Sequence, residues 1–279
     1  MTLLAIDIGN SRIKAGIFKG KKLSGEMLFP TTPSFGTAKF WTELKKLLRD
    51  HAVSRHAITG AVISSVVPPL TIKLTAFINR RFRVKTLVVT GTMDTGLCIR
   101  YRNPQTLGAD RICSAVAAYH RYGGPLIIID MGTAVTYNVV SKEGVFLGGA
   151  IAPGLWTAST VLHEQTAKLP NVMLQFPRSI VGKTTIENIQ SGILYGMVGA
   201  IEGIIKRMKR ITGKRTKIFL TGGGAYLIKS KIDIDSYVIP SLVLHGARII
   251  YERQQKLPVR VGSKKKKQGK LSHSPCYCR

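Results

Sequence analysis

The sequence predicts an α/β protein made of two related units, each with a β-sheet flanked by helices, and three observations support this. First, the chain opens with two apolar runs, Leu3–Ile8 and Arg12–Phe18, which indicate two strands joined by a turn. Second, strands and amphipathic helices alternate after this opening, as they do in layered α/β domains. Third, the pattern of the opening recurs at Leu126–Val140, which predicts an internal duplication.

The opening turn carries residues suited to phosphate binding. Asp7 lies at the far end of the first apolar run, and Gly9, Asn10 and Ser11 follow as a tight turn. A carboxylate in this position suits a metal ion or a metal-bound water, while backbone N–H groups, the Ser11 hydroxyl and Lys14 suit phosphate oxygens. The alternative is an ordinary β-hairpin with one solvated aspartate, because the pattern is short.

The second copy of this pattern reads LIIIDMGTAVTYNVV and contains Asp130, Gly132 and Thr133 in corresponding places. Two half-similar units could hold one polyphosphate from both sides. The alternative is a chance resemblance, because a buried strand followed by a turn is common.

Composition indicates a globular chain with room for two domains. The 279 residues are 44% hydrophobic and 20% charged, and no run of 18 apolar residues predicts a membrane span. The N-terminus has no basic region or cleavage site of a signal peptide. The cysteines are too few for a disulfide framework. We therefore expect a soluble, cytoplasmic protein.

The formal net charge of +28 can reflect binding to nucleic acid, binding to anionic metabolites or a habitat preference. Arg253 to Arg279 contains nine Lys or Arg and no acid, and the rest of the chain is basic as well. No DNA- or RNA-reading motif stands out, so small anions are favoured over nucleic acid. The tail lacks apolar residues to bury and is expected to be disordered, and its His273, Cys276 and Cys278 are too close together for a zinc site.

Periodicity places the elements of the first unit. Phe40, Trp41, Leu44, Leu47 and Leu48 recur at helical spacing and predict an amphipathic helix at 37–50. Pro68-Pro69 is expected to end a buried strand. The remaining expected elements are strands at 23–29, 61–67 and 86–90 and helices at 71–82 and 111–122.

In the second unit, Gly182-Lys183-Thr184-Thr185 invites a phosphate-loop interpretation, but Pro177 stands where that motif needs its first glycine. Thr184 and Glu187 instead predict a capping box that opens a helix at 185–210. The other expected elements are a helix at 156–166, a strand at 217–220 running into Thr221–Gly224, and a helix at 225–229.

The long helix carries an unusual stripe of glycines, Gly192, Gly196, Gly199 and Gly203. Each interior glycine costs a helix about 1 kcal/mol relative to alanine. Such a stripe is expected where another backbone packs close, which could be an internal strand, a partner helix or both.

Several short motifs follow one another along the chain. They are DIGNSRIKAG from Asp7, YRNP from Tyr101, GADR from Gly108, DMGT from Asp130, GGAIAPG from Gly148, TAKLP from Thr166, GKTT from Gly182 and TGGG from Thr221. In these motifs and their order, the chain resembles the type III pantothenate kinases over about Leu3 to Arg248. Ser11 departs from the usual threonine but retains the hydroxyl, and the lysine-rich tail has no counterpart.

The resemblance implies two ribonuclease-H-like (actin-like ATPase) domains at 1–115 and 116–252, with a basic tail at 253–279. It implies ATP-dependent phosphorylation of pantothenate to 4'-phosphopantothenate, the first step of coenzyme A biosynthesis. It also implies Mg²⁺, a monovalent cation (K⁺ or NH₄⁺) and a homodimer.

The resemblance also implies roles for individual residues. The ATP-binding residues are Asp7, Ile8, Gly9, Asn10, Ser11, Arg12, Ile13, Lys14 and Thr133. The pantothenate-binding residues are Tyr101, Gly108, Ala109, Asp110, Arg111 and Thr185. Asp130 is the expected metal ligand, and Asp110 is the expected catalytic base. The alternative for Asp110 is a residue that only stabilises the start of a helix.

A second hypothesis is a non-enzymatic, nucleic-acid-associated transcriptional accessory factor on the same fold. A degenerate binding module could have lost Asp7, Asp110, Arg111 and Asp130, but the chain retains all four.

Overall fold

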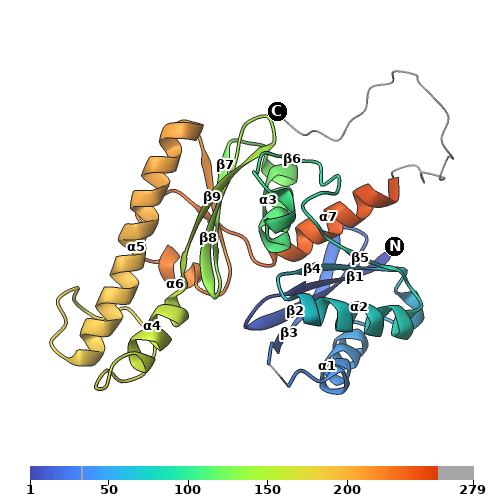
Figure 1. Cartoon of the computed structure of the whole chain (residues 1–279), viewed down its shortest axis with the longest axis horizontal. Helices are drawn as coiled ribbons and strands as arrows, with labels where there is room; N and C mark the ends of the chain where they lie inside the picture. Colours follow the sequence, from blue (N-terminus) through green and yellow to red (C-terminus); the bar gives the residue numbers. More distant parts are fainter. Residues whose placement is uncertain (33, 257–279) are drawn as a thin grey trace. The chain divides into compact units, whose positions relative to one another are not determined.

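The computed structural model describes residues 1–32 and 34–256, so the expected tail lies almost entirely outside the described residues. The chain forms two compact units, one of Met1–Ala117 with the chain from Val243 onward and one of Ala118–Leu242. Figure 1 shows that each unit contains a β-sheet and helices. The predicted fold class is confirmed.

The first unit contains a mixed sheet with the strand order β3-β2-β1-β4-β5. The strands of this sheet are β1 (Thr2–Ile8), β2 (Arg12–Lys19), β3 (Lys22–Pro30), β4 (Gly60–Ser65) and β5 (Thr86–Val88), and the short β6 (Cys98–Ile99) is not part of it. Its helices are α1 (Thr37–Asp50), η1 (Arg55–Ala57), α2 (Pro68–Phe82), η2 (Pro104–Thr106), most of α3 (Ala109–Tyr122) and α7 (Leu242–Lys256). The first three strands are antiparallel, whereas β4 is parallel to β1 and β5 to β4.

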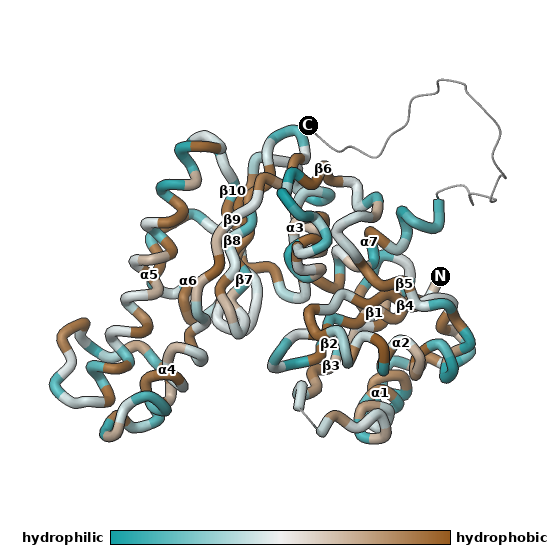
Figure 2. Tube along the Cα trace, in the orientation of Figure 1, coloured by the Kyte–Doolittle hydropathy of each residue, from teal (hydrophilic) through white to brown (hydrophobic). Residues whose placement is uncertain are grey.

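Alternation along β1 assigns its side chains to two faces. Leu4, Ile6 and Ile8 belong to the core formed with α1 and α2. Asp7 has the opposite parity and therefore points to the other face of the sheet. Figure 2 shows hydrophobic residues along this strand, as expected for a buried central strand.

The second unit repeats this arrangement. Its sheet includes five strands of this unit in the order β9-β8-β7-β10-β11, with bounds β7 (Leu126–Met131), β8 (Ala134–Val140), β9 (Val145–Pro153), β10 (Lys217–Thr221) and β11 (Tyr237–Val238). Its own helices are α4 (Leu155–Glu164), α5 (Thr185–Thr212) and α6 (Ala225–Lys229). Three antiparallel strands are again followed by two that join in parallel, which supports the expected duplication.

Helix α7 packs with the first unit, although the expected C-terminal domain ran to residue 252. A Cβ at Gly246 would collide with the carbonyl oxygen of Cys113 on α3, so only glycine lets the two helices approach this closely. The Phe18 and His245 rings also meet edge to face, with centroids 5.2 Å apart. Side chains of α7 also lie against the first sheet, because a Cβ at Gly16 would meet Leu244 and a Cβ at Gly60 would meet Tyr251.

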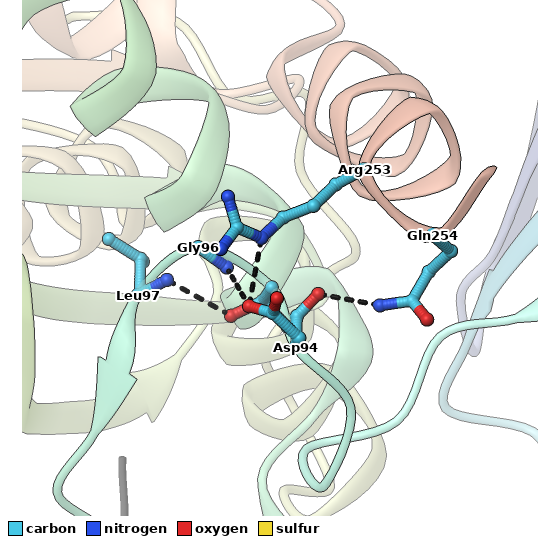
Figure 3. Close-up of polar contacts among 6 residues, drawn as sticks. Asp94, Gly96, Leu97, Arg253 and Gln254 are labelled. Carbon is cyan, nitrogen blue, oxygen red and sulfur yellow. Dashed lines mark hydrogen bonds and ion pairs between the residues drawn. The ribbon is translucent and has the colours of Figure 1, made fainter. Parts of the chain in front are cut away.

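The end of α7 is also fastened to a loop of the first unit (Figure 3). Arg253 Nε lies 2.8 Å from Asp94 Oδ1, and Gln254 Nε2 donates to the Asp94 carbonyl at 2.6 Å. The Gly96 N–H donates to the same carboxylate oxygen at 3.1 Å. This loop therefore holds the last described turn of α7.

The start of α2 and the surroundings of the glycines on α5 refine what the sequence predicted. Helix α2 begins at Pro68 rather than at 71, because proline at a first helical position gives up an N–H that would have no helical partner. A Cβ at Gly192, Gly196 or Gly199 of α5 would meet nothing within 4 Å among the described residues, which excludes the internal strand as the explanation of the stripe. No helix in the described ranges has the length and apolarity to cross a bilayer.

Candidate functional site

Hydrogen bonds fix the conformation of the turn after β1. The Gly9 N–H donates to the Arg12 carbonyl at 3.0 Å, and a Cβ at Gly9 would press on that carbonyl at 3.1 Å. Thr31, which directly follows β3, supports the turn, because its hydroxyl donates to the Gly9 carbonyl at 2.8 Å. Asn10 and Ser11 are exposed at the tip, where their polar groups can meet a ligand.

Asp7 is held from the neighbouring strand. It lies opposite Ser64 in the parallel register of β1 and β4, and Ser64 Oγ donates to Asp7 Oδ1 at 3.0 Å. Ser64 is fully buried, whereas Asp7 is half-buried. The buried Ser64 hydroxyl therefore orients a carboxylate that is only partly buried.

Asp110 occupies the first turn of α3, and its carboxylate folds back over the helix start. Its Oδ1 accepts a hydrogen bond of 2.8 Å from the Arg111 N–H. A Cβ at Gly108 would collide with this oxygen, so a larger residue there would displace the Asp110 carboxylate. Burial raises the pKa of Asp110 above its usual value of 3.8, and the Arg111 N–H and guanidinium offset part of that rise.

Cys113 connects the two carboxylates. It is fully buried on α3, close to the Ser64 side chain. Burial raises the pKa of its thiol well above the usual 9.0, the charges of Asp7 and Asp110 raise it further, and the Ser64 side chain lowers it. Both carboxylates therefore act on one buried thiol, and the first unit brings Asp7 and Asp110 into one electrostatic neighbourhood.

The second unit has a corresponding turn after β7. The Gly132 N–H donates to the Ala134 carbonyl at 3.1 Å. The Thr133 carbonyl accepts from the Gly154 N–H at 2.9 Å and from the Thr157 hydroxyl at 2.6 Å. These bonds fix the turn while the Thr133 residue stays exposed.

Asp130 of this turn lies opposite Thr221 on β10, as Asp7 lies opposite Ser64. A Cβ at Gly222 would collide with Asp130 Oδ1, and the Gly222 φ of +86° is in the region that favours glycine. The Gly224 N–H donates to the Met131 carbonyl at 3.1 Å. The Thr221–Gly224 segment therefore packs its backbone directly against the aspartate turn.

The predicted site residues are divided between the two units. Residues 7–14 form the end of β1, its turn and the start of β2, and residues 108–111 form the start of α3, all in the first unit. Tyr101 belongs to the same unit and is half-buried between β6 and η2. Asp130, Thr133 and the exposed Thr185, the first residue of α5, belong to the second unit.

Sequence reasoning missed Ser64, Cys113 and Thr31 as parts of the site. The two serines that end the apolar strand at 60–65 were an available signal, because polar residues at a strand end often serve a site. The parallel register that places Ser64 opposite Asp7 could not be read from the sequence.

The donor set suits Mg²⁺ that is bound together with phosphates. Mg²⁺ is usually held in proteins by one or two carboxylates plus substrate phosphates and waters. The oriented, half-open Asp7 carboxylate beside a turn of backbone N–H groups fits this pattern. Within the described ranges, no group of three or more His, Cys, Asp or Glu side chains is placed to hold a metal ion by itself.

Comparison with known families gives one match. A sequence model described as type III pantothenate kinase matches residues 3–207, which is more than half of the chain. The match includes both aspartate turns and the start of α3.

Solved structures with a similar fold share little sequence with this chain. A conserved candidate transcriptional activator of the Baf family from Campylobacter jejuni has a TM-score of 0.57 and 18% identity, covering 91% of this chain and 100% of that one. Component A of the (R)-2-hydroxyglutaryl-CoA dehydratase of Acidaminococcus fermentans has a TM-score of 0.57 and 15% identity, with coverage of 92% and 100%. The ethanolamine utilization protein EutJ from Carboxydothermus hydrogenoformans has a TM-score of 0.53 and 13% identity, covering 90% of each chain. At these identities the similarity concerns the fold alone.

Proposed function

The chain belongs to the type III pantothenate kinase family, and on this premise we propose that it transfers the γ-phosphoryl group of ATP to the primary hydroxyl of pantothenate. This reaction forms 4'-phosphopantothenate and begins coenzyme A biosynthesis. The observation that carries the proposal is the pair Asp7 and Asp110, two carboxylates of the first unit that are oriented by separate donors.

Asp110 is the proposed proton acceptor. The pantothenate hydroxyl oxygen bonds to the γ-phosphorus, the bond from that phosphorus to the β,γ-bridging oxygen breaks, and ADP leaves with the electron pair. The hydroxyl proton passes to the Asp110 carboxylate. Burial raises the pKa of Asp110, and the raised pKa makes this carboxylate a stronger base than an exposed aspartate.

The two aspartate turns are the proposed phosphate-binding elements. Phosphoryl transfer depends mainly on alignment and on neutralising phosphate charge, and bound Mg²⁺ supplies part of that neutralisation. Asp7 would hold this ion, and the N–H groups from Gly9 to Ser11 and the Thr133 residue would bind phosphate oxygens. Asp130 would hold a monovalent cation, since an unshielded carboxylate would repel a nearby triphosphate.

Pantothenate binding is assigned to the start of α3 and two further segments. Arg111 is suited to the substrate carboxylate because guanidinium binds carboxylate through two parallel hydrogen bonds. The remaining proposed contacts are Tyr101, Gly108, Ala109 and Thr185.

A homodimer is proposed through α5. The open faces of Gly192, Gly196 and Gly199 could accept a second copy of the helix at short distance. Sedimentation of the wild type and of a Gly196→Leu/Gly199→Leu variant tests this, and an unchanged dimer mass in the variant would contradict it.

The transcriptional alternative is not favoured, because Asp7 and Asp110 keep oriented carboxylates that a degenerate binding module would not need. The decisive assay follows ADP release with and without pantothenate in K⁺, NH₄⁺ and Na⁺ at constant Mg²⁺. We expect release to require pantothenate and to be faster in K⁺ or NH₄⁺. ADP release that is independent of pantothenate would contradict the proposed substrate. Equal rates in all three salts would contradict only the proposed monovalent-cation site.

A further inference from the structure

A hollow of about 270 Å³ lies where α2 ends, separate from the residues of the candidate site. It is lined by Arg55, His56, Arg80, Arg81, Phe82 and Arg83. All four arginines are exposed, and the buried Phe82 lies among them. The hollow belongs to the first unit alone, and the tube is hydrophilic where α2 ends in Figure 2.

The positive charge of this arginine hollow is not neutralised. Among residues 1–32 and 34–256, none of its four arginines forms an ion pair with a carboxylate. Two of them have neutral neighbours instead. Arg55 Nε donates to His56 Nε2 at 3.2 Å, and the Arg81 guanidinium lies 4.4 Å from the centroid of the Trp41 ring. These contacts hold guanidinium groups in place without cancelling their charge.

Helix electrostatics account for only part of this cluster. Arg80 and Arg81 lie in the last turn of α2, where cations stabilise the helix dipole. Arg55 comes from another segment, η1. Arg83 has φ 57° and ψ 40°, a left-handed conformation in which glycine is the usual residue after a helix. Four guanidinium groups from separate positions therefore converge on one concavity.

A second, larger hollow adjoins the first. It has a volume of about 590 Å³ and shares Arg55 with the arginine hollow. Its other lining residues are Trp41, Thr42, Glu43, Lys45, Lys46, Leu48, Arg49 and Val53. Three further cations and one acid line it, so the basic surface continues along α1 and can accommodate an anion longer than a single phosphate.

We propose that the arginine hollow is a second anion site that binds an oligophosphate, a compact anion with two or more neighbouring phosphate groups. Guanidinium is the side chain best matched to phosphate, because its fork donates two parallel hydrogen bonds to two oxygens. Four unpaired guanidinium groups match the charge of such a ligand. A concave cluster suits a compact anion better than the long, regular backbone of a nucleic acid. The source is either free inorganic oligophosphate or the phosphate tail of a nucleotide.

Titration calorimetry of the whole protein at low salt tests the site with inorganic tripolyphosphate, ADP and a single-stranded oligonucleotide of about 20 bases. The test variant is Arg55→Ala/Arg83→Gly, in which glycine suits the left-handed backbone and so preserves the fold. The control is Arg215→Ala, which removes one exposed arginine from the turn before β10 in the other unit.

We expect the wild type and the control to bind one more tripolyphosphate per chain than the double variant does. Each lost arginine should raise the Kd of this site for tripolyphosphate at least about tenfold. Competition by ADP identifies a nucleotide tail as the source, and its absence identifies inorganic oligophosphate. The KM for ATP should stay unchanged in the double variant, which separates this site from the catalytic one. Equal tripolyphosphate stoichiometry in all three proteins would overturn the proposal. The proposal would also be overturned if the oligonucleotide bound through these arginines and tripolyphosphate did not.

Discussion

Ser64 Oγ donates a hydrogen bond of 3.0 Å to Asp7 Oδ1 from the adjacent parallel strand. In the second unit, Thr221 lies at the matching position opposite Asp130. Each aspartate turn is therefore paired with a hydroxyl residue at the end of the next strand. In the first unit this hydroxyl orients the Asp7 carboxylate from the neighbouring strand.

Ser64→Ala should weaken use of MgATP. A hydrogen bond to a charged group contributes about 1.5–3 kcal/mol, so kcat/KM for ATP should fall about ten- to a hundredfold. Steady-state kinetics at varied ATP measure the effect. Ser65→Ala is the neighbouring control, because Ser65 bonds only to the start of α2 through Val67 and Thr71. Equal kinetics in Ser64→Ala and the wild type would show that Asp7 needs no support.

Asp110→Asn should abolish most turnover without loosening the fold. Removing the proton acceptor is expected to lower kcat by a factor of about 10² to 10⁴. Burial penalises the charged carboxylate, so the neutral amide should leave the free energy of unfolding at pH 7 unchanged or higher. Chemical denaturation and single-turnover kinetics on one preparation separate the two effects. A folded Asp110→Asn protein with wild-type kcat would show that Asp110 only stabilises the start of α3.

The pH profile of kcat provides an independent measure of the same group. Turnover needs ionised Asp110 and should be lost as pH falls through its raised pKa, so the acid limb lies above 3.8. The stability contribution has the opposite sign. It is fully present below the unfolded pKa and is lost as pH rises through the folded pKa. An acid limb at or below 3.8 would contradict the burial of this carboxylate.

Asp94→Asn should loosen the end of α7. The hydrogen bond from Arg253 lowers the pKa of Asp94 despite partial burial, so its stabilisation exists above the unfolded pKa and is lost as pH falls below 3.8. Both side chains are more than a third exposed, so solvent screening limits the effect to about 1 kcal/mol or less. Hydrogen exchange along α7 at pH 7 measures it. Asp50→Asn, which breaks the exposed Arg49–Asp50 pair, should have no effect there.

Gly246→Ala should destabilise the first unit, although alanine is the better helix former. The added methyl group would meet the Cys113 carbonyl, and overpacking of this kind typically costs about 1–3 kcal/mol. Thermal unfolding of Gly246→Ala and of the wild type measures the effect. An unchanged or raised unfolding temperature in the variant would contradict the close packing of α7 on α3.

Local signals in the sequence predicted much of this fold. The helix at 37–50 has the predicted bounds, because its apolar stripe is regular. The helix predicted at 185–210 begins at Thr185 and runs to Thr212, and Thr184 Oγ1 accepts the Glu187 N–H as the capping box requires. The reciprocal bond differs by one residue, since Glu187 accepts from the Lys183 N–H.

Long-range features could not be predicted in the same way. The pairing of Asp7 with Ser64 depends on a parallel register set by residues far apart in the sequence. The return of α7 to the first unit depends on the fit of Gly246 against Cys113, which no local pattern records. The arginine hollow likewise combines Arg55 with the end of α2, which only the folded chain brings together.

The most direct test of the proposed function is identification of the phosphorylated product. The protein is incubated with MgATP, K⁺ and pantothenate, and ADP and phosphorylated product are quantified by mass spectrometry and ³¹P NMR, with Asp110→Asn as the control. The account predicts one 4'-phosphopantothenate for each ADP formed, with both greatly reduced in the control. ATP consumption by the wild type without phosphopantothenate, or equal product formation by Asp110→Asn, would contradict it.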